Sequence, residues 1–261
     1  MKILCIGDIF GRPGRRAVRA CLDEIVDKHD VSLVIANAEN AAGGFGLTPS
    51  IADELFGYGI HVLTGGNHTW DKREVGELLE DNERVLRPHN YPRENPGSGM
   101  TIIEVDDAKV AVLNLQGRIF MPTIDCPFQA VDRLIDAVQD EADLIVVDLH
   151  AEATSEKMAM AWHLDGRATV LVGTHTHVQT ADEQVFPKGL AYMSDLGMTG
   201  PHRSIIGVRV EQSLGRFLNG RPSRFEAATG DVRFHGLVID ADERSGRARS
   251  VCRIQVHLGE T

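Results

Sequence analysis

The chain has 261 residues, of which 27 are lysine or arginine and 38 are aspartate or glutamate, so its formal net charge at neutral pH is -11. This charge argues against the basic surface with which proteins hold a nucleic-acid backbone, and we expect no direct, unspecific nucleic-acid binding. An acidic protein that handles phosphate needs positive charge from another source, and metal ions are one. The length allows one large α/β domain or two small ones, and we expect a single domain over residues 1–261.

Nothing in the sequence predicts export or membrane insertion. The first apolar run is too short for a signal segment, and Asp8 interrupts it. No uninterrupted apolar stretch approaches the roughly 20 residues that a membrane-spanning helix needs. The four cysteines are scattered singly, which favours reduced thiols over a disulfide framework or a structural zinc site. We therefore expect a soluble, cytoplasmic protein with no membrane partner.

Short runs rich in Val, Ile and Leu alternate with amphipathic stretches over the first two thirds of the chain, which is typical of strands joined by crossover helices. The predicted strands are residues 2–6, 32–36, 61–63, 101–105, 110–115, 144–149 and 169–172. The predicted helices are residues 15–28, 49–58, 72–82, 127–141 and 155–162. Several strands are apolar throughout, as expected when both faces of a sheet are covered, so the class is α/β.

The pattern changes after about Gln184. The apolar stretches 190–193, 205–210, 232–239 and 250–256 follow one another without helical periodicity and predict mainly antiparallel strands. A second sheet packed on the first would bury their apolar side, giving a two-sheet β-sandwich flanked by helices on both sides. The segment 88–99, with three prolines and two glycines, is expected to be a surface or active-site loop rather than a domain boundary.

Polar side chains follow several predicted strands, and each has an ordinary structural explanation when taken alone. Asp8 precedes a glycine-rich turn, where an aspartate often serves as a turn or cap residue. Glu39 and Asn40 follow the second strand, and Glu39 could be a solvated charge. Two glycines after the third strand indicate a tight, exposed turn that presents Asn67 and His68.

Three histidines end later strands. His150 closes the apolar run 144–149, where a buried histidine with satisfied hydrogen bonds is the ordinary interpretation. His175 and His177 flank one residue after another apolar strand, and extended backbone there would point both to one side. A close histidine pair at a strand end favours metal binding.

The combination of these segments is more informative than its parts. Five segments each place Asp, Glu, Asn or His at the carboxyl end of a predicted strand, which is the edge where open α/β sheets bind ligands. Imidazole, carboxylate and amide ligands without thiolate suit Mn, Fe or Zn. Two ions roughly 3.5–4 Å apart could make a hydroxide at neutral pH and clamp phosphoryl oxygens. The sequence therefore predicts a binuclear site for phosphate ester chemistry.

Six segments, in the right order and spacing over most of the chain, resemble the calcineurin-like metallophosphoesterases and in particular their YmdB-like branch. They are GDIFGRPGR at residues 7–15, NAENAAGG at 37–44, GGNHTW at 65–70, HAE at 150–152, GTHTHV at 173–178 and SDLGMTG at 194–200. The resemblance implies a metallophosphoesterase-like four-layer architecture. It also implies hydrolysis of cyclic nucleotides, both 2′,3′ and 3′,5′, as the activity.

Two departures from the wider superfamily affect which residue does what. Where most members carry an Asp-x-His pair, this chain has Phe10 in place of the histidine. Where most members carry a bridging aspartate, this chain has Glu39 followed by Asn40.

The resemblance implies three ligands for each of two ions, with one bridging residue. The first set is Asp8, Asn40 and His177, the second set is Asn67, His150 and His175, and Glu39 bridges them. It also implies that His68 protonates the leaving oxygen, a role that suits an imidazole near neutral pH.

The glycine-rich turn 7–14 is a rival signal, because it precedes a helix whose free N–H groups could receive phosphate. It lacks the Gly-Lys-Ser/Thr ending of a P-loop and matches no dinucleotide fingerprint. Its simpler interpretation is that it lets Asp8 approach the metals, while Arg12, Arg15 and Arg16 are mostly solvated charges. Contact of Arg12 with a substrate phosphate stays open, and Arg12 is not assigned to the site.

The sequence thus favours a metal-dependent phosphoesterase, acting by attack of a metal-bridging hydroxide on a small phosphate ester or cyclic nucleotide. Iron and manganese are both compatible with the ligands, and zinc is not excluded. The alternative is a non-catalytic regulator that keeps the site to bind a nucleotide or a protein partner. A generic phosphomonoesterase and a homo-oligomer also stay open.

Overall fold

Two β-sheets packed face to face form the centre of the molecule, which the computed structural model describes for residues 1–258. Within that range the first sheet has the order β2-β11-β12-β1-β3-β4, with β13 paired to β12. Its strands are β1 (Lys2–Ile6), β2 (Asp8–Ile9), β3 (Leu33–Asn37), β4 (Val62–Thr64), β11 (Met198–Pro201), β12 (Val232–Asp242) and β13 (Arg247–His257). The second has the order β5-β6-β7-β8-β10-β9. Its strands are β5 (Met100–Val105), β6 (Ala108–Gln116), β7 (Leu144–His150), β8 (Val170–Thr174), β9 (Gln184–Val185) and β10 (Ala191–Met193).

The continuous apolar runs of the sequence form strands that are buried on both faces. In β1, Ile3 and Cys5 join the cluster between the two sheets, whereas Leu4 and Ile6 join the cluster under the helices. Strand β7 repeats this division between alternate residues. Because successive side chains of a strand point to opposite faces, a strand covered on both sides needs apolar residues at every position.

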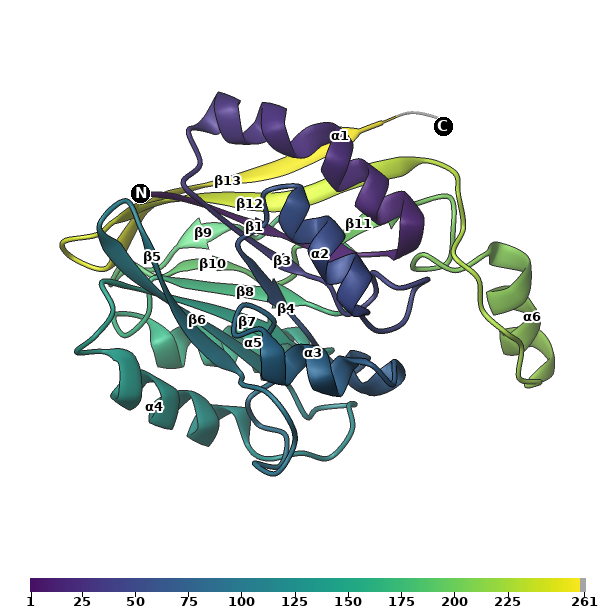
Figure 1. Cartoon of the computed structure of the whole chain (residues 1–261), viewed down its shortest axis with the longest axis horizontal. Coiled ribbons are helices and arrows are strands. Elements are labelled where there is room, and N and C mark those ends of the chain that lie inside the picture. The colour runs from purple at the N-terminus through teal and green to yellow at the C-terminus, as the bar shows by residue number, and fades with distance from the viewer. Residues whose placement is uncertain (259–261) are drawn as a thin grey trace.

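Helices cover both outer faces of the sandwich (Figure 1). The helices are α1 (Gly11–His29), α2 (Pro49–Gly57), α3 (Val75–Asp81), α4 (Pro127–Val138), α5 (Thr154–Leu164) and α6 (Val210–Asn219), with the 3₁₀ turn η1 (Thr69–Asp71). Residues of α1, α2 and α3 pack on the first sheet, and residues of α4 and α5 pack on the second. The predicted α/β class and the two-sheet sandwich between helical layers are confirmed. Within residues 1–258, no helix is long and apolar enough to cross a membrane.

The carboxyl-terminal third does not build the second sheet by itself, as the sequence interpretation assumed. Strands β12 and β13 extend the first sheet, where β12 pairs antiparallel with β1, while β9 and β10 extend the second. The second sheet is formed mainly by β5 to β8, from the middle of the chain. The expectation was wrong because periodicity identifies a strand but not the edge with which it pairs.

The segment 205–210 was also predicted incorrectly as a strand. It takes part only in isolated bridges, between Ile205 and Val208 and between Val208 and Ala227, and Val210 begins α6. This helix stands clear of the sandwich at the right of the view (Figure 1), and Phe217 and Leu218 are 80% and 78% exposed. The apolar side chains of α6 are not buried against the sandwich. Their order in the sequence therefore shows neither the pattern of a helix packed on a sheet nor that of a strand, and the strand prediction failed.

The start of α1 differs from its prediction and matters for the site. The helix begins at Gly11 rather than at Arg15, because Pro13 lies in its first turn, where a helix tolerates proline. The amide of Gly11 donates to the carbonyl oxygen of Asn40 at 2.9 Å. The helix is therefore anchored to the segment that carries Glu39 and Asn40.

Candidate metal centre

The structure gathers the predicted site residues at the carboxyl ends of the strands. Strands β1, β3 and β4 are parallel in the first sheet, and β7 and β8 are parallel in the second. Asp8 lies in β2, Glu39 and Asn40 follow β3, Asn67 and His68 follow β4, His150 ends β7, and His175 and His177 follow β8. Ligand atoms of Glu39, His150 and His175 all lie within 4.8 Å of one another.

Three acceptor atoms surround Nε2 of the fully buried His150. The Oδ1 atom of Asn67 lies 2.9 Å away, Oε1 of Glu39 lies 3.0 Å away, and Nδ1 of His175 lies 3.0 Å away. One imidazole N–H cannot satisfy three acceptors at once. A cation placed among these atoms satisfies all of them, so the residues fit a metal ion.

A second group of lone pairs faces the ring of His177. Its Nδ1 lies 2.9 Å from the carbonyl oxygen of Ile206 and must donate to it, which leaves the lone pair of a neutral ring on Nε2. This Nε2 lies 3.3 Å from Oδ1 of Asn40 and 3.7 Å from Oδ1 of Asp8. Asn40 directs its oxygen there because its Nδ2 donates to Gly44 at 3.0 Å. Converging acceptors of this kind again fit a cation.

Asp8 lies between the two groups. Its Oδ1 is buried and has no hydrogen-bond partner among the described residues, and it lies 3.9 Å from Nδ1 of His150 as well as 3.7 Å from His177. Burial raises the pKa of Asp8 to about 6, although the charges of His177 and His150 oppose the shift. The other oxygen, Oδ2, accepts from the amide of His175 at 3.2 Å. A buried carboxylate oxygen without a donor is unfavourable unless a cation compensates its charge.

Glu39 and His150 perturb each other strongly. Burial raises the pKa of Glu39, but the charges and hydrogen bonds of His150 and His68 together lower it to about 2. Burial lowers the pKa of His150, but the carboxylates of Glu39, Asp8 and Asp148 together raise it to about 9. Burial, followed by the charge of His150, lowers the pKa of His175 to about 3. The cluster therefore attracts one positive charge, which a metal ion can supply in place of the proton.

A hydrogen-bond relay behind His150 was not anticipated from the sequence. Oγ1 of Thr174 donates to Asp148 at 2.8 Å and lies 2.9 Å from Nδ1 of His150. Since the hydroxyl proton points to the carboxylate, Thr174 accepts from Nδ1–H, and Nε2 is free for the cluster. Asp148 also accepts from Thr64 and Asn37. The sequence did contain one signal for this relay, because Asp148 is a charged residue within an otherwise apolar strand.

The backbone at the two histidines is not extended, so the condition under which the sequence would point both to one side is not met. His175 and His177 have φ values of 102° and 66°, in the left-handed region that side chains other than glycine rarely adopt. Nζ of the buried Lys157 donates to the carbonyl of Thr174 at 2.9 Å and to Asp195 at 2.8 Å. Asp195 in turn accepts from the amide between the two histidines at 3.0 Å. This buried ion pair holds the loop.

Gly66 permits the close approach of two strand ends. A Cβ atom at this position would lie 2.3 Å from Oε2 of Glu39 and 2.4 Å from Cδ2 of His150. No side chain fits there, so packing at the site requires glycine at position 66. This is one of the two glycines from which the sequence predicted a tight turn.

His68 lies beside the cluster rather than within it. Its backbone amide donates to Oε2 of Glu39 at 2.8 Å, and its Nδ1 lies 2.8 Å from Oδ2 of Asp71. Its side chain is 30% exposed, and its ring meets the ring of Phe45 edge-on. With Nδ1 held by Asp71, the ring offers Nε2 for proton transfer.

A cavity of about 560 Å³ lies in front of these residues. Glu39, Asn40, His68, His175 and His177 line it, together with aromatic side chains and residues of α6. Asp8 and His150 are fully buried. The cavity size suits a small organic ligand.

Comparison with known proteins places the chain in a family. A family model described as "YmdB-like protein" matches residues 4–254. The chain is 44% identical over 257 residues to a Bacillus subtilis (strain 168) protein named 2′,3′-cyclic-nucleotide 2′-phosphodiesterase, covering 98% of this chain and 97% of that protein.

Solved structures agree with this match. A hypothetical protein from Thermus thermophilus superimposes with a TM-score of 0.93 at 46% identity, covering 98% of this chain and 99% of that one. A Mycoplasma pneumoniae protein described as a novel phosphatase gives 0.93 at 34% identity, covering 98% and 93%. A 5′-nucleotidase precursor from Thermus thermophilus, at 13% identity and a TM-score of 0.60, shares the fold over 54% of its length. The resemblance inferred from the motifs is confirmed: the chain belongs to the YmdB-like family of metallophosphoesterase-like proteins.

Proposed function

We propose that the protein is a metal-dependent phosphodiesterase that hydrolyses cyclic nucleotides, the 2′,3′-cyclic phosphates first among them. The observation that carries the proposal is the convergence of acceptor atoms around Nε2 of His150 and Nε2 of His177, next to a cavity. The name of the Bacillus subtilis relative supports the choice of substrate.

The proposed ligands divide as the resemblance implies. Asn67, His150 and His175 would hold one ion, Asp8, Asn40 and His177 would hold the other, and Glu39 would be shared between them. Carboxylate, amide and imidazole donors favour iron or manganese, with zinc compatible. When bound, such an ion pair activates water near neutral pH and neutralises charge that builds on the phosphoryl oxygens.

His68 is the proposed general acid. The alkoxide released from a cyclic nucleotide is a poor leaving group, so its oxygen must gain a proton as the P–O bond breaks. His68 lines the cavity and does not belong to either ligand group, and Asp71 orients its ring through Nδ1. Its Nε2 delivers the proton to the leaving oxygen.

The test is hydrolysis of 2′,3′-cyclic AMP and bis(p-nitrophenyl) phosphate by metal-stripped protein resupplied with manganese. Glu39→Gln is run in parallel, with Glu104→Gln on the exposed side of β5 as the matched control. We expect metal-dependent turnover in the parent and the control, and its loss together with the metals in Glu39→Gln. Absence of turnover in metal-loaded parent protein would contradict the proposal and favour the regulator. Full turnover with both metals retained in Glu39→Gln would contradict the role of Glu39.

A further inference from the structure

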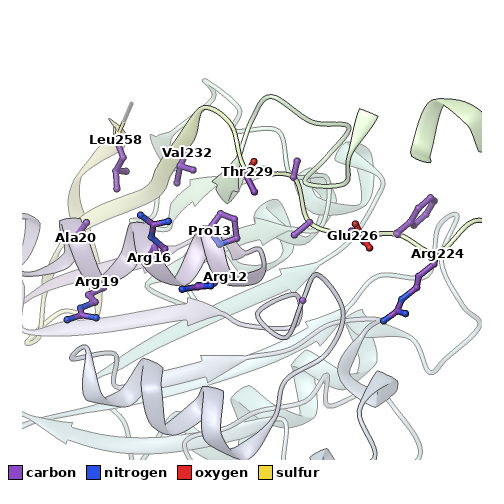
Figure 2. Close-up of a pocket in the computed structure, with 14 residues that line it drawn as sticks. Arg12, Pro13, Arg16, Arg19, Ala20, Arg224, Glu226, Thr229, Val232 and Leu258 are labelled. Carbon is purple, nitrogen blue, oxygen red and sulfur yellow. The ribbon is translucent and has the colours of Figure 1, made fainter. Parts of the chain in front are cut away.

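Next to the metal centre lies a second cavity, of about 860 Å³, whose wall carries four arginines. Arg12, Arg16 and Arg19 project from the first turns of α1, and Arg224 belongs to the segment between α6 and β12 (Figure 2). These side chains are exposed. A group of four arginines is notable in a chain with a net charge of -11.

The four guanidinium groups have no compensating partner in the part of the chain that the structure describes. Within residues 1–258, no ion pair or side-chain hydrogen bond joins any of them to another residue. Arg15 provides the contrast, since it pairs with Glu54 at 3.0 Å and donates to the carbonyl of Ala41 at 2.7 Å. Its interpretation from sequence as a solvated charge was wrong. Glu226, which also lines the cavity, pairs with Arg209 at 2.9 Å.

The placement of these arginines on α1 is unfavourable for the helix itself. The first turn of α1 contains no acidic residue and includes Arg12, although the amino end of a helix favours negative charge. Arg12 and Arg16 are four positions apart, and Arg16 and Arg19 are three apart, so like charges are neighbours on one helix face. Their role is therefore not the stability of α1. A bound anion would offset both the positive charge at the amino end of the helix and the repulsion between neighbouring arginines.

The arginine-lined cavity adjoins the cavity in front of the metal cluster. Phe225 lines both of them. Gly43, which lines the arginine-lined cavity, lies three residues after Asn40, and the amide of Gly11 beside Arg12 bonds to the carbonyl of Asn40. The two cavities are therefore neighbours, as a subsite for an extended ligand requires.

We propose that the arginine-lined cavity is a subsite for backbone phosphates of the substrate, so that the preferred substrate is a short RNA ending in a 2′,3′-cyclic phosphate rather than a mononucleotide. The inference rests on the proposed phosphodiesterase function. Guanidinium groups match phosphate oxygens bidentately, and unpaired ones are available to do so. The cyclic end requires a ribose 2′-oxygen, which identifies the polymer as RNA. The acidic remainder of the protein disfavours binding elsewhere along a nucleic acid.

Binding is measured first, because it does not depend on turnover. The probe is a fluorescent 2′-O-methyl tetra-adenylate, titrated by anisotropy with the manganese-loaded protein at several salt concentrations. The variant is Arg12→Gln/Arg16→Gln/Arg224→Gln, and the control is Arg133→Gln, an exposed arginine on α4 in the opposite helical layer. We expect at least tenfold weaker binding and a smaller salt dependence in the triple variant, with the control unchanged.

Equal binding by parent and triple variant, or no binding by the parent, would overturn the subsite. A third outcome is that inorganic phosphate stabilises the parent but the tetra-adenylate does not bind. This result would assign the cavity to a free anion and would also overturn the RNA subsite.

Kinetics then test the substrate preference. The parent is expected to show about tenfold higher kcat/KM for a tri-adenylate with a 2′,3′-cyclic phosphate end than for 2′,3′-cyclic AMP. The triple variant is expected to lose this advantage through KM, while its hydrolysis of 2′,3′-cyclic AMP stays as in the parent. Identical kinetics for both substrates in the parent, or equal losses on both in the variant, would overturn the preference. If the parent hydrolyses neither substrate, the proposed function fails, and the binding titration still decides the subsite.

Discussion

At the residue scale, the free nitrogen of His150 is selected by groups that do not belong to the ligand cluster. Thr174 donates to Asp148 and accepts from Nδ1–H of His150, which directs Nε2 toward Glu39 and Asn67. Partners of this kind orient a metal-binding imidazole and raise its basicity.

Thr174→Val removes the hydroxyl while keeping the shape of the side chain. We expect metal affinity to fall about 10- to 100-fold, because the His150 ring loses its fixed tautomer and orientation. Titration of metal-free protein with manganese measures this. Thr101→Val, at a buried threonine in β5, is the matched control. Unchanged affinity in a folded Thr174→Val protein would contradict the relay.

His68→Ala separates proton transfer from metal binding. We expect it to keep its metals and to cleave substrates that release p-nitrophenolate at nearly the parent rate, because that leaving group needs no proton. Hydrolysis of 2′,3′-cyclic AMP is expected to fall by about 10²- to 10⁴-fold. Asp71→Asn, which weakens the hold on Nδ1, is expected to give a smaller fall of the same selectivity. Equal losses on both substrates would argue against His68 as the acid.

At the element scale, helix α5 fixes the loop that follows β8. Lys157 on α5 is 2% exposed and reaches both the carbonyl of Thr174 and the carboxylate of Asp195. Asp195 also accepts from the amide of Gly197 at 2.8 Å. The buried pair therefore joins a helix, the end of a strand and the left-handed loop between two proposed ligands.

Lys157→Met leaves the Asp195 charge buried without its partner. Removal of one member of a buried pair is expected to lower the free energy of unfolding by about 3–5 kcal/mol. Adding Asp195→Asn should restore part of this loss, since the amide oxygen can still accept from the loop while the charge is gone. Urea unfolding of both variants measures the effect. A double variant no more stable than Lys157→Met would show that the unpaired charge was not the cause.

At the scale of the whole molecule, the proposed metal ligands come from both sheets. The proposed ligands come from β2 and the ends of β3 and β4 in one sheet, and from β7 and β8 in the other. Ions held between the sheets bind the folded chain only, so binding should stabilise the fold.

Metal removal is therefore expected to lower the melting temperature. At a free metal concentration 100 times Kd, one ion contributes about 2.7 kcal/mol. For a protein near this size, each kcal/mol shifts Tm by about 2–4 °C. Calorimetry with and without chelator measures the shift, and Glu39→Gln should show a smaller one. Equal melting temperatures of metal-free and metal-loaded parent protein would contradict ligands contributed from both sheets.

The sequence by itself determined the repeating elements and the places where polar residues end them. Strands buried on both faces have apolar residues at every position, and helices show a longer period, so both are local signals. Asp8, Glu39, Asn67, His150 and His175 could be named because each directly follows such a run. Their convergence followed from the rule that parallel strands share a carboxyl edge.

Only the tertiary structure decided how these residues meet and which others support them. Asn67 and His150 are 83 positions apart, and Asp8 and His175 are 167 apart, so no local pattern fixes their atoms within hydrogen-bond distance. The sheet joined by β12, the exposed helix α6, and the contacts of Thr174 and Lys157 depend equally on chain segments distant in sequence. Periodicity records whether a side chain is buried, whereas packing decides what it is buried against.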